Sequence, residues 1–401
     1  LAAFLEAHEA CVFDAAKQEL TVVVLCPVGS PNSALRAARA RALELAARWS
    51  AACAAPAPAL PPAGAPALPL AVSFDEAGFV RAVARCQEYI AAGDTYQVNL
   101  STRLEVPAVD TLGAYEALRS ANPSPYMGFV RLPGVSLACG SPELLVEVAG
   151  GRVASRPIAG TRPRGADEAA DLAWARELSG DTKEKAEHLM LVDLLRNDVG
   201  RVSRPGTVRV PEFMAVERYS HVMHLVSQVE GDLAAGAGPA DVVRALFPGG
   251  TVTGAPKVRT MQVIAELEPV ARAYYTGSLG WIGASGELCL NIIIRSLWSA
   301  EGRAFVQAGA GVVADSVPAR EYAESLRKAQ APLLAAARDF DADLGHRFST
   351  YAFWGIRSAV MRELNFLRRT VRLPRNLHEQ LSKLRKAEEL DPLSSVIQNE
   401  I

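Results

Sequence analysis

The chain has 401 residues, enough to bury one large hydrophobic core or two ordinary ones. Half of the residues are hydrophobic, and the formal net charge at pH 7 is -2. This charge excludes a strongly basic protein that binds nucleic acid or an anionic membrane through its overall charge. No apolar run approaches the length of a bilayer span, and the six cysteines are scattered without a CxxC pair. We therefore expect a soluble protein of the cytoplasm, or of a plastid if the source is a photosynthetic eukaryote.

The first part of the chain predicts a small unit followed by a linker. Residues 10–26 predict two short strands around a polar turn, and an Ala/Arg-rich helix is expected from Ser33 to Ala52. Residues 53–72 form an Ala/Pro-rich linker. The chain starts without methionine and without the basic residues of a signal peptide, so we expect residues 1–52 to be the remnant of a longer N-terminal region.

Residues 73–340 carry the clearest pattern of secondary structure. A helix is expected to start at an N-cap Ser73 and to close at Gly93, and a long helix is expected over roughly 167–195. A strand-rich half follows at 278–313. Strands that are interleaved with long helices, without regular βαβ alternation, predict an α+β domain with a largely antiparallel sheet.

Two pairs of glutamates, each three residues apart, indicate a candidate metal site. Glu184 and Glu187 share one face of the predicted long helix, and Glu321 and Glu324 repeat this spacing near the end of the domain. Carboxylate oxygens suit Mg²⁺, which binds one or two carboxylates together with waters and substrate. The alternative is that the glutamates are solvated partners of neighbouring lysine and arginine side chains.

A glycine-rich stretch, FVQAGAGVVADS, joins a predicted strand to a predicted helix. Gly309, Gly311 and Ala314 match the Gly-x-Gly-x-x-Ala pattern of dinucleotide-binding proteins, so an NAD enzyme is one alternative. No second nucleotide-binding half follows, and no strand ends in an acidic residue at the expected distance. The other interpretation is that the glycine amides approach a carboxylate directly.

Charged and polar residues also stand where apolar ones are expected. His224 lies inside an apolar run, as either a core histidine or a site residue, and Arg295 interrupts the buried-looking strand LNIIIRSLW. The stretch RPIAGTRPRG spaces Arg156, Arg162 and Arg164 around a short apolar run. This stretch is either a strand with a solvated basic edge or a site for an anionic ligand.

A series of ordered motifs in residues 73–334 carries a family resemblance. The motifs are YQVNLS, NPSPYM, CGSPELLV, RPIAGTRPRG, EKAEHLMLVDLLRND, ERYSHVMHLVS, FPGGTVTGAPKVRTM, YTGSLGWIG, LNIIIRS and QAGAGVVADS. Together they resemble the chorismate-utilising aminating enzymes, the component I subunits of aminodeoxychorismate synthase and anthranilate synthase. The resemblance implies two packed antiparallel sheets with helices outside and the ligand between them. It also implies an enzyme that needs chorismate, Mg²⁺ and ammonia from a separate glutamine amidotransferase subunit, with no role for a membrane.

The resemblance assigns roles to the unusual residues. The catalytic positions would be Glu143, His224, Thr251 and Ala159, with Glu143 as the acid that protonates the leaving C4 hydroxyl. Glu187 and Glu324 would bind Mg²⁺, with Glu184 and Glu321 as outer or water-mediated partners. The substrate-binding residues would be Thr161, Tyr275, Arg295, Gly309, Gly311 and Lys328. Among them, the glycine amides would hold the ring carboxylate of chorismate, and Arg295 and Tyr275 its enolpyruvyl carboxylate.

The motifs disagree about the product. Ala159 stands where many aminodeoxychorismate synthases carry a lysine that attacks C2, whereas alanine is typical of anthranilate synthases. CGSPELLV, YTGSLGW and several other stretches look more like the aminodeoxychorismate branch. We therefore expect aminodeoxychorismate synthase component I, which serves 4-aminobenzoate and folate biosynthesis. The alternative is anthranilate synthase component I, which serves tryptophan biosynthesis.

Residues 341–401 predict a separate, short all-α module. From His346 to Leu390 there are ten Lys or Arg residues against four acidic ones, and aromatic residues stand beside arginines. The module resembles a fragment of a primary-type sigma factor, whose side chains suit melted single-stranded DNA. Trp354 is followed by Gly355 instead of a second tryptophan, and the polymerase-binding helices are absent, so we expect a fused fragment. A DNA-binding enzyme is the alternative, and only then would nucleic acid be a partner.

Overall fold

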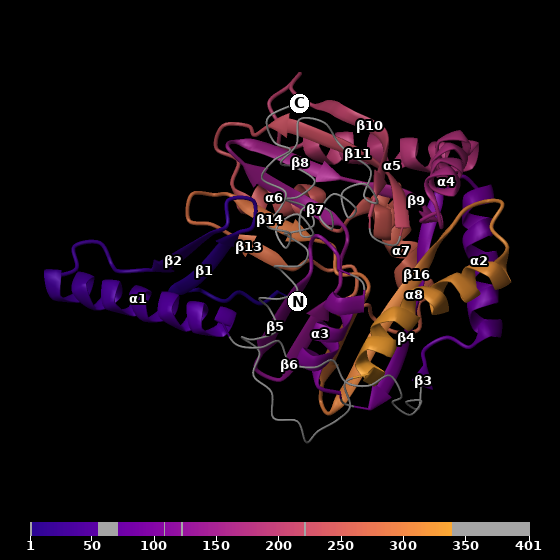
Figure 1. Ribbon diagram of the computed structural model, residues 1–401. Helices are drawn as coiled ribbons and strands as arrows, with labels where there is room; N and C mark the ends of the chain where they lie inside the picture. Colours follow the sequence, from indigo (N-terminus) through magenta and orange to yellow (C-terminus); the bar gives the residue numbers. More distant parts are fainter. Residues whose placement is uncertain (1, 55–70, 108, 122, 220–221, 339–401) are drawn as a thin grey trace, which may run out of the picture. The chain divides into compact units, whose positions relative to one another are not determined.

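A computed structural model describes residues 2–54, 71–107, 109–121, 123–219 and 222–338 (Figure 1). Residues 1–59 and residues 60–343 belong to different compact units. Most of the expected linker and the whole sigma-like module lie outside the described residues. No helix in the described ranges is long and apolar enough to cross a membrane.

The N-terminal unit consists of a β-hairpin and one helix. Its elements are β1 (Glu9–Asp14), β2 (Glu19–Val24) and α1 (Asn32–Ala54). The two strands pair antiparallel, and the ring of Phe13 on β1 stacks on Trp49 of α1 with 6.0 Å between centroids. Arg41 of α1 forms a two-point ion pair with Glu9. The two strands and the helix expected here are confirmed.

Residues 71–338 build two seven-stranded antiparallel sheets (Figure 1). The first sheet has the order β10-β11-β8-β7-β14-β13, with β9 also paired to β11. Its strands are β7 (Leu144–Ala149), β8 (Arg152–Arg156), β9 (Ile158–Pro163), β10 (Arg209–Arg218), β11 (Val222–Asp232), β13 (Gly280–Ile282) and β14 (Leu288–Asn291).

The second sheet has the order β12-β4-β16-β15-β6-β5, with β3 also paired to β4. Its strands are β3 (Ala71–Val72), β4 (Gln97–Pro107), β5 (Gly128–Leu132), β6 (Val135–Cys139), β12 (Gly254–Ala255), β15 (Ser296–Ala300) and β16 (Arg303–Val312). The two sheets and their helices confirm the expected α+β class.

Helices pack on both sheets because each carries an apolar stripe. On α2, Phe79, Ala82, Val83 and Cys86 follow the helical repeat and are buried against β4 and α7. Helices α2, α3 and α8 pack on the second sheet, and α4 and α5 on the first. The helices are α2 (Glu76–Ala91), α3 (Thr111–Ala121), α4 (Glu168–Gly180), α5 (Thr182–Gly200), α6 (Pro239–Leu246), the 3₁₀ turn η1 (Gly250–Val252), α7 (Lys257–Leu267) and α8 (Pro318–Arg338).

Two expected helix boundaries are wrong. The single helix expected over 167–195 is two helices, because Asp181 adopts extended backbone and its carboxylate accepts the N–H groups of Lys183 and Glu184. The side chain of Asp75, not Ser73, caps α2, by accepting the N–H of Gly78 at 2.6 Å. The hydroxyl of Ser73 instead accepts the backbone N–H of Arg103 on β4.

The chain crosses between the two sheets at two neighbouring places. Residues 140–143, the first crossover, lead from β6 in the second sheet to β7 in the first. Residues 292–295, the second crossover, lead from β14 in the first sheet back to β15 in the second. The crossovers touch, because the backbone N–H of Ile292 donates to the carbonyl of Glu143 at 3.1 Å. Each crossover ends in a charged side chain, Glu143 or Arg295.

Candidate active site

Glu143 is a buried carboxyl group held by the first crossover. Its side chain is 6 % exposed, and burial raises its pKa to about 7. Thr251 and the positive charges of Arg295 and Lys328 partly oppose this rise. The backbone N–H of Glu143 donates to Ser141 Oγ at 3.1 Å, which holds the backbone of the first crossover at this residue. A carboxyl group with this pKa can hold a proton near neutral pH and give it up to a leaving group.

Arg295 stands at the end of the second crossover with an unusual backbone. Its φ is 50°, in the left-handed region that non-glycine residues rarely adopt. Its guanidinium makes no hydrogen bond or ion pair with another described residue. Burial lowers the pKa of Arg295 and the charge of Glu143 opposes this, but an arginine still stays protonated. A partly buried cation without a carboxylate at hydrogen-bond distance is suited to an anionic ligand.

Strands β9 and β11 bring Thr161 and His224 together across a β-bulge. Thr161 pairs with His224 and Ala159 with Leu225, so Gly160, with φ of 61°, is the extra residue. Nδ1 of His224 lies 3.0 Å from Thr161 Oγ1 and 3.2 Å from the Gly160 carbonyl. A carbonyl only accepts hydrogen bonds, so Nδ1 carries the proton and Nε2 is the free acceptor.

His224 is neutral, and the charge of Arg295 on the second crossover acts on its imidazole. Burial lowers its pKa, and the positive charge of Arg295 lowers it further. The phenol ring of Tyr219 packs against the imidazole with 5.7 Å between centroids. Ala159, one residue before the bulge, is buried at 8 % exposure and offers no nucleophile.

The three arginines of RPIAGTRPRG are all engaged by carboxylates. Arg156 pairs with Glu212 and Glu217, and Arg164 with Asp171. Arg162 contacts three carboxylates, those of Glu177, Asp181 and Glu184. The arginines act as structural cations at a partly exposed edge, and none of the three is free of a carboxylate partner for an anionic ligand.

The two glutamate pairs lie near the starts of α5 and α8, which face a common region. Burial raises the pKa of Glu187 and of Glu321, and in each case the neighbouring glutamate of the pair raises it further. The positive charge of Lys328 acts on Glu143, Glu187 and Glu321, so this lysine lies among all three. Lys328 Nζ is 2.7 Å from Glu324 Oε1 and 3.2 Å from the Gly309 carbonyl.

These carboxylates fit Mg²⁺ by their chemistry. They are hard oxygen donors, and a divalent cation would offset the burial and the neighbouring negative charge that raise the pKa of Glu187 and Glu321. Within the described ranges, no group of three or more His, Cys, Asp or Glu side chains is close enough to hold a metal ion.

Gly309 and Gly311 lie within β16, not in a turn between a strand and a helix. The strand pairs antiparallel with both β4 and β15, so the dinucleotide-binding alternative is wrong. A Cβ on Gly309 would lie 2.5 Å from the Leu100 carbonyl oxygen, and one on Gly311 would lie 2.6 Å from Gln97 Nε2. Gly309 therefore needs glycine because the β4 backbone approaches it closely, whereas a Cβ on Gly311 would meet only the end of the Gln97 side chain.

Gln97 belongs to the site, although sequence reasoning missed it. Its Nε2 donates to Glu187 Oε1 at 2.6 Å, and its Oε1 is buried without a hydrogen-bond partner among the described residues. Gln97 and Asn99 alternate with the apolar Val98 and Leu100 on β4. That alternation of buried polar and apolar residues was the signal available in the sequence.

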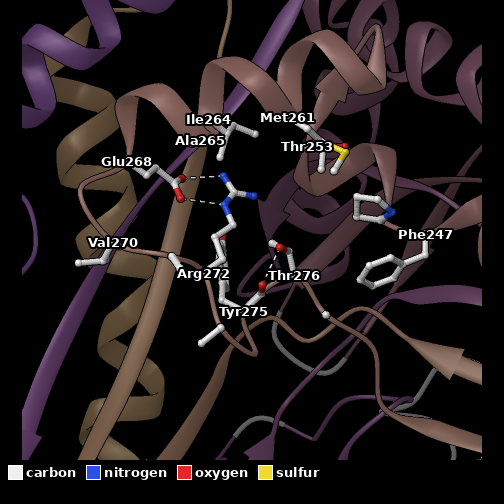
Figure 2. A pocket seen from close by; sticks show the side chains of 14 residues that line it. Phe247, Thr253, Met261, Ile264, Ala265, Glu268, Val270, Arg272, Tyr275 and Thr276 are labelled. Atoms are coloured by element: carbon white, nitrogen blue, oxygen red, sulfur yellow. Dashed lines mark hydrogen bonds and ion pairs between the residues drawn. The ribbon is translucent and has the colours of Figure 1, made fainter. Parts of the chain in front are cut away.

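Tyr275 lines a cavity of about 450 Å³ (Figure 2). One wall carries the buried ion pair of Glu268 and Arg272, and Arg272 also donates to the Val252 carbonyl. Burial raises the pKa of Tyr275, and the nearby charge of Glu143 raises it too. Of the predicted site residues only Tyr275 lines this cavity, which is otherwise largely apolar.

Thr251 completes the group of predicted residues that the structure brings together. It lies in η1, within reach of Glu143, but its buried Oγ1 makes no hydrogen bond of good geometry to another described residue. The predicted site residues thus converge from β9, β11, β16, α5, α8, η1 and the two crossovers.

Comparison with known proteins matches residues 1–334 to the family of chorismate binding enzymes. Aminodeoxychorismate synthase component 1 of Bacillus subtilis is 55% identical over 260 residues, which cover 65% of this chain and 55% of that protein. Anthranilate synthase component 1 of Streptomyces coelicolor is 48% identical over 342 residues, 84% of this chain and 67% of that protein. The chain thus spans little more than half of the first of these relatives.

Solved structures agree with this assignment. The crystal structure of anthranilate synthase component I from Streptococcus pneumoniae matches with a TM-score of 0.72 and 36% identity. The match covers 81% of this chain and 72% of that one. The family match over residues 1–334 includes both sheets and every residue of the site described above, and the chain belongs to the chorismate-binding enzyme family.

Proposed function

We propose that the chain is component I of an aminodeoxychorismate synthase, which aminates chorismate with ammonia to 4-amino-4-deoxychorismate. The main support for a reaction on chorismate is the contact between the two crossovers. There the buried acid Glu143 lies near Arg295, a cation without an ion pair among the described residues. The branch is supported by the motifs of the aminodeoxychorismate type.

Each charged group of chorismate has a counterpart in the site. Arg295 and Tyr275 bind the enolpyruvyl carboxylate, and the backbone of Gly309 and Gly311 binds the ring carboxylate. Glu143 gives its proton to the C4 hydroxyl, which leaves as water. His224, on β11, offers its unprotonated Nε2 as a hydrogen-bond acceptor, because its Nδ1 proton is bound by Thr161 and the Gly160 carbonyl.

Glu187 and Glu324 would hold Mg²⁺, with Glu184 and Glu321 as outer partners. When bound, this ion supplies Lewis-acid polarisation of the substrate ring. Gln97 keeps the Glu187 carboxylate oriented through its 2.6 Å hydrogen bond. Ammonia would come from a separate glutamine amidotransferase subunit, in keeping with the name "component 1" that the relatives carry.

A second candidate is anthranilate synthase component I, which forms anthranilate and pyruvate. Ala159 favours it, because the residue offers no amine for a covalent step at C2. The Streptomyces coelicolor and Streptococcus pneumoniae relatives carry this name. The two candidates share the site and differ in the position at which ammonia adds.

A product assay separates the two candidates. Chorismate, Mg²⁺ and ammonium at mildly alkaline pH should give 4-aminobenzoate only when aminodeoxychorismate lyase is added. Anthranilate formed without the lyase would assign the chain to the second candidate. The variant Glu143→Gln should lose about 100-fold or more of kcat, whereas Glu147→Gln, exposed on the neighbouring β7, should keep it. An equal effect of both variants would contradict the role of Glu143.

A further inference from the structure

Gly140, the first residue of the first crossover, lies against the backbone of Arg295. A Cβ on Gly140 would stand 2.7 Å from the Arg295 carbonyl oxygen and 3.9 Å from the Arg295 Cβ. Side-chain carbons do not approach a backbone oxygen so closely, and a backbone atom cannot swing aside as the end of a flexible side chain can. This position therefore accepts only glycine as long as Arg295 keeps its place.

The backbone around Arg295 is held on both sides. Before it, the N–H of Ile292 donates to the Glu143 carbonyl at 3.1 Å, and the carbonyl of Ile293 accepts the N–H of Thr276 at 2.9 Å. After it, Ser296 pairs with Cys139, the residue next to Gly140. Arg295 can relieve its left-handed φ of 50° only by moving this held segment.

The guanidinium has no hydrogen bond or ion pair with another described residue to orient it. The direction of the side chain is therefore set by the backbone from which it starts and by the packing around it. A shift of the Arg295 carbonyl would rotate that backbone and carry the guanidinium away from the carboxyl group of Glu143, whose charge it now faces.

We propose that Gly140 is a positioning residue that leaves room for the Arg295 carbonyl and so fixes where the guanidinium points. The consequence for substrate rests on the proposed function, in which Arg295 binds a carboxylate of chorismate. The contact between the two crossovers does not depend on that function. The proposal makes the two crossovers one unit, in which Gly140 acts on substrate binding through the backbone of Arg295.

A double-mutant cycle on chorismate binding tests the proposal. Gly140→Ala should raise the Kd for chorismate about 10-fold, and Arg295→Gln should raise it at least as much. In the Arg295→Gln background, Gly140→Ala should add less than about 2-fold, because the group it displaces is already gone. If the Kd of the double variant rises by the product of the two single-variant fold-changes, the proposal is overturned. Gly200→Ala is the matched control, since its Cβ would meet only Val208 Cγ2 at 3.9 Å.

A second measurement needs no ligand and separates this proposal from the proposed function. Glycine adopts a φ of 50° without strain, so Arg295→Gly should unfold at a higher urea concentration than Arg295→Ala. Gly140→Ala should lower the urea midpoint less in the Arg295→Gly background than in the wild type. Equal midpoints for the two Arg295 variants, or equal losses in the two backgrounds, would overturn the contact. A wild-type chain that binds no chorismate would overturn only the proposed function.

Discussion

Glu143 makes the stability of the protein depend on pH in a direction opposite to that of most carboxylates. Burial raises its pKa from the ordinary 4.5 to about 7, so the folded state favours the protonated form. Its contribution to the free energy of unfolding is full below the pKa of the unfolded chain, 4.5, and is lost as the pH rises through 7. Above that pH the buried carboxylate lowers the free energy of unfolding by about 3 kcal/mol.

The variant Glu143→Gln should therefore be more stable than the wild type at pH 8, by about 3 kcal/mol, and equally stable near pH 4.5. Urea unfolding at a series of pH values measures the difference. Glu147→Gln, on the exposed side of β7, serves as the control and should leave the pH dependence unchanged. A constant difference between Glu143→Gln and wild type at all pH values would contradict the raised pKa.

At this scale the sequence indicated which residue types were out of place, but not what they contact. Arg295 was recognisable because a guanidinium interrupts an apolar run. The single strand expected over LNIIIRSLW is wrong, since β14 ends at Asn291 and β15 begins at Ser296, and the left-handed backbone of Arg295 and its contact with Gly140 depend on a distant crossover. Arg156, Arg162 and Arg164 left two interpretations open, and each arginine is paired with carboxylates of other elements. Charge pairing between distant segments is not visible in a local pattern.

At the scale of elements, the break between α4 and α5 decides where the first glutamate pair begins. Asp181 accepts the N–H groups of Lys183 at 2.9 Å and Glu184 at 3.1 Å, and its carboxylate also pairs with Arg162. The sequence predicted one continuous helix because the apolar spacing persists through the break. The competing signal was the Gly-Asp-Thr at 180–182, where an aspartate can cap a new helix.

Replacing this cap should affect both stability and the region of the glutamates. Asp181→Ala should lower the free energy of unfolding by about 1 kcal/mol, and so should Asp75→Ala, which removes the cap of α2. Only Asp181→Ala should alter the rise in unfolding temperature on adding Mg²⁺, because its turn carries Glu184. Thermal unfolding with and without Mg²⁺ measures both effects. An identical response to Mg²⁺ in the two variants would contradict a metal site at the start of α5.

For the whole molecule, every element that supplies a predicted site residue lies within residues 71–338. Both sheets, both crossovers and the two glutamate-bearing helices belong to this one unit. The N-terminal helix α1, which belongs to the other unit, contains no fully buried residue.

A chain of residues 71–338 should consequently bind chorismate like the complete chain. The rise in its unfolding temperature at a given chorismate concentration should match that of the complete chain, since a ligand stabilises the state it binds. Differential scanning fluorimetry of both chains provides the comparison. If the shorter chain folds but chorismate no longer raises its unfolding temperature, residues outside 71–338 contribute to the site.

The α+β class and most helices were predictable, because hydrophobic periodicity is a local property. The partners of the strands were not. Strand β4 pairs with β16 from the opposite end of the domain, and β12 with β4 across a similar interval. Such pairs depend on the complete fold, and only the resemblance to a family supplied the two-sheet arrangement in advance.

The contact between the two crossovers affects the order of events when the protein folds. Gly140 and Arg295 are far apart in the sequence, and they meet where the chain passes from one sheet to the other. Contacts between distant segments form late, because the entropy of closing a long loop is lost before the contacts contribute any favourable free energy. During refolding, the capacity to bind a dianion should appear after most of the secondary structure has formed, as the two sheets lock together.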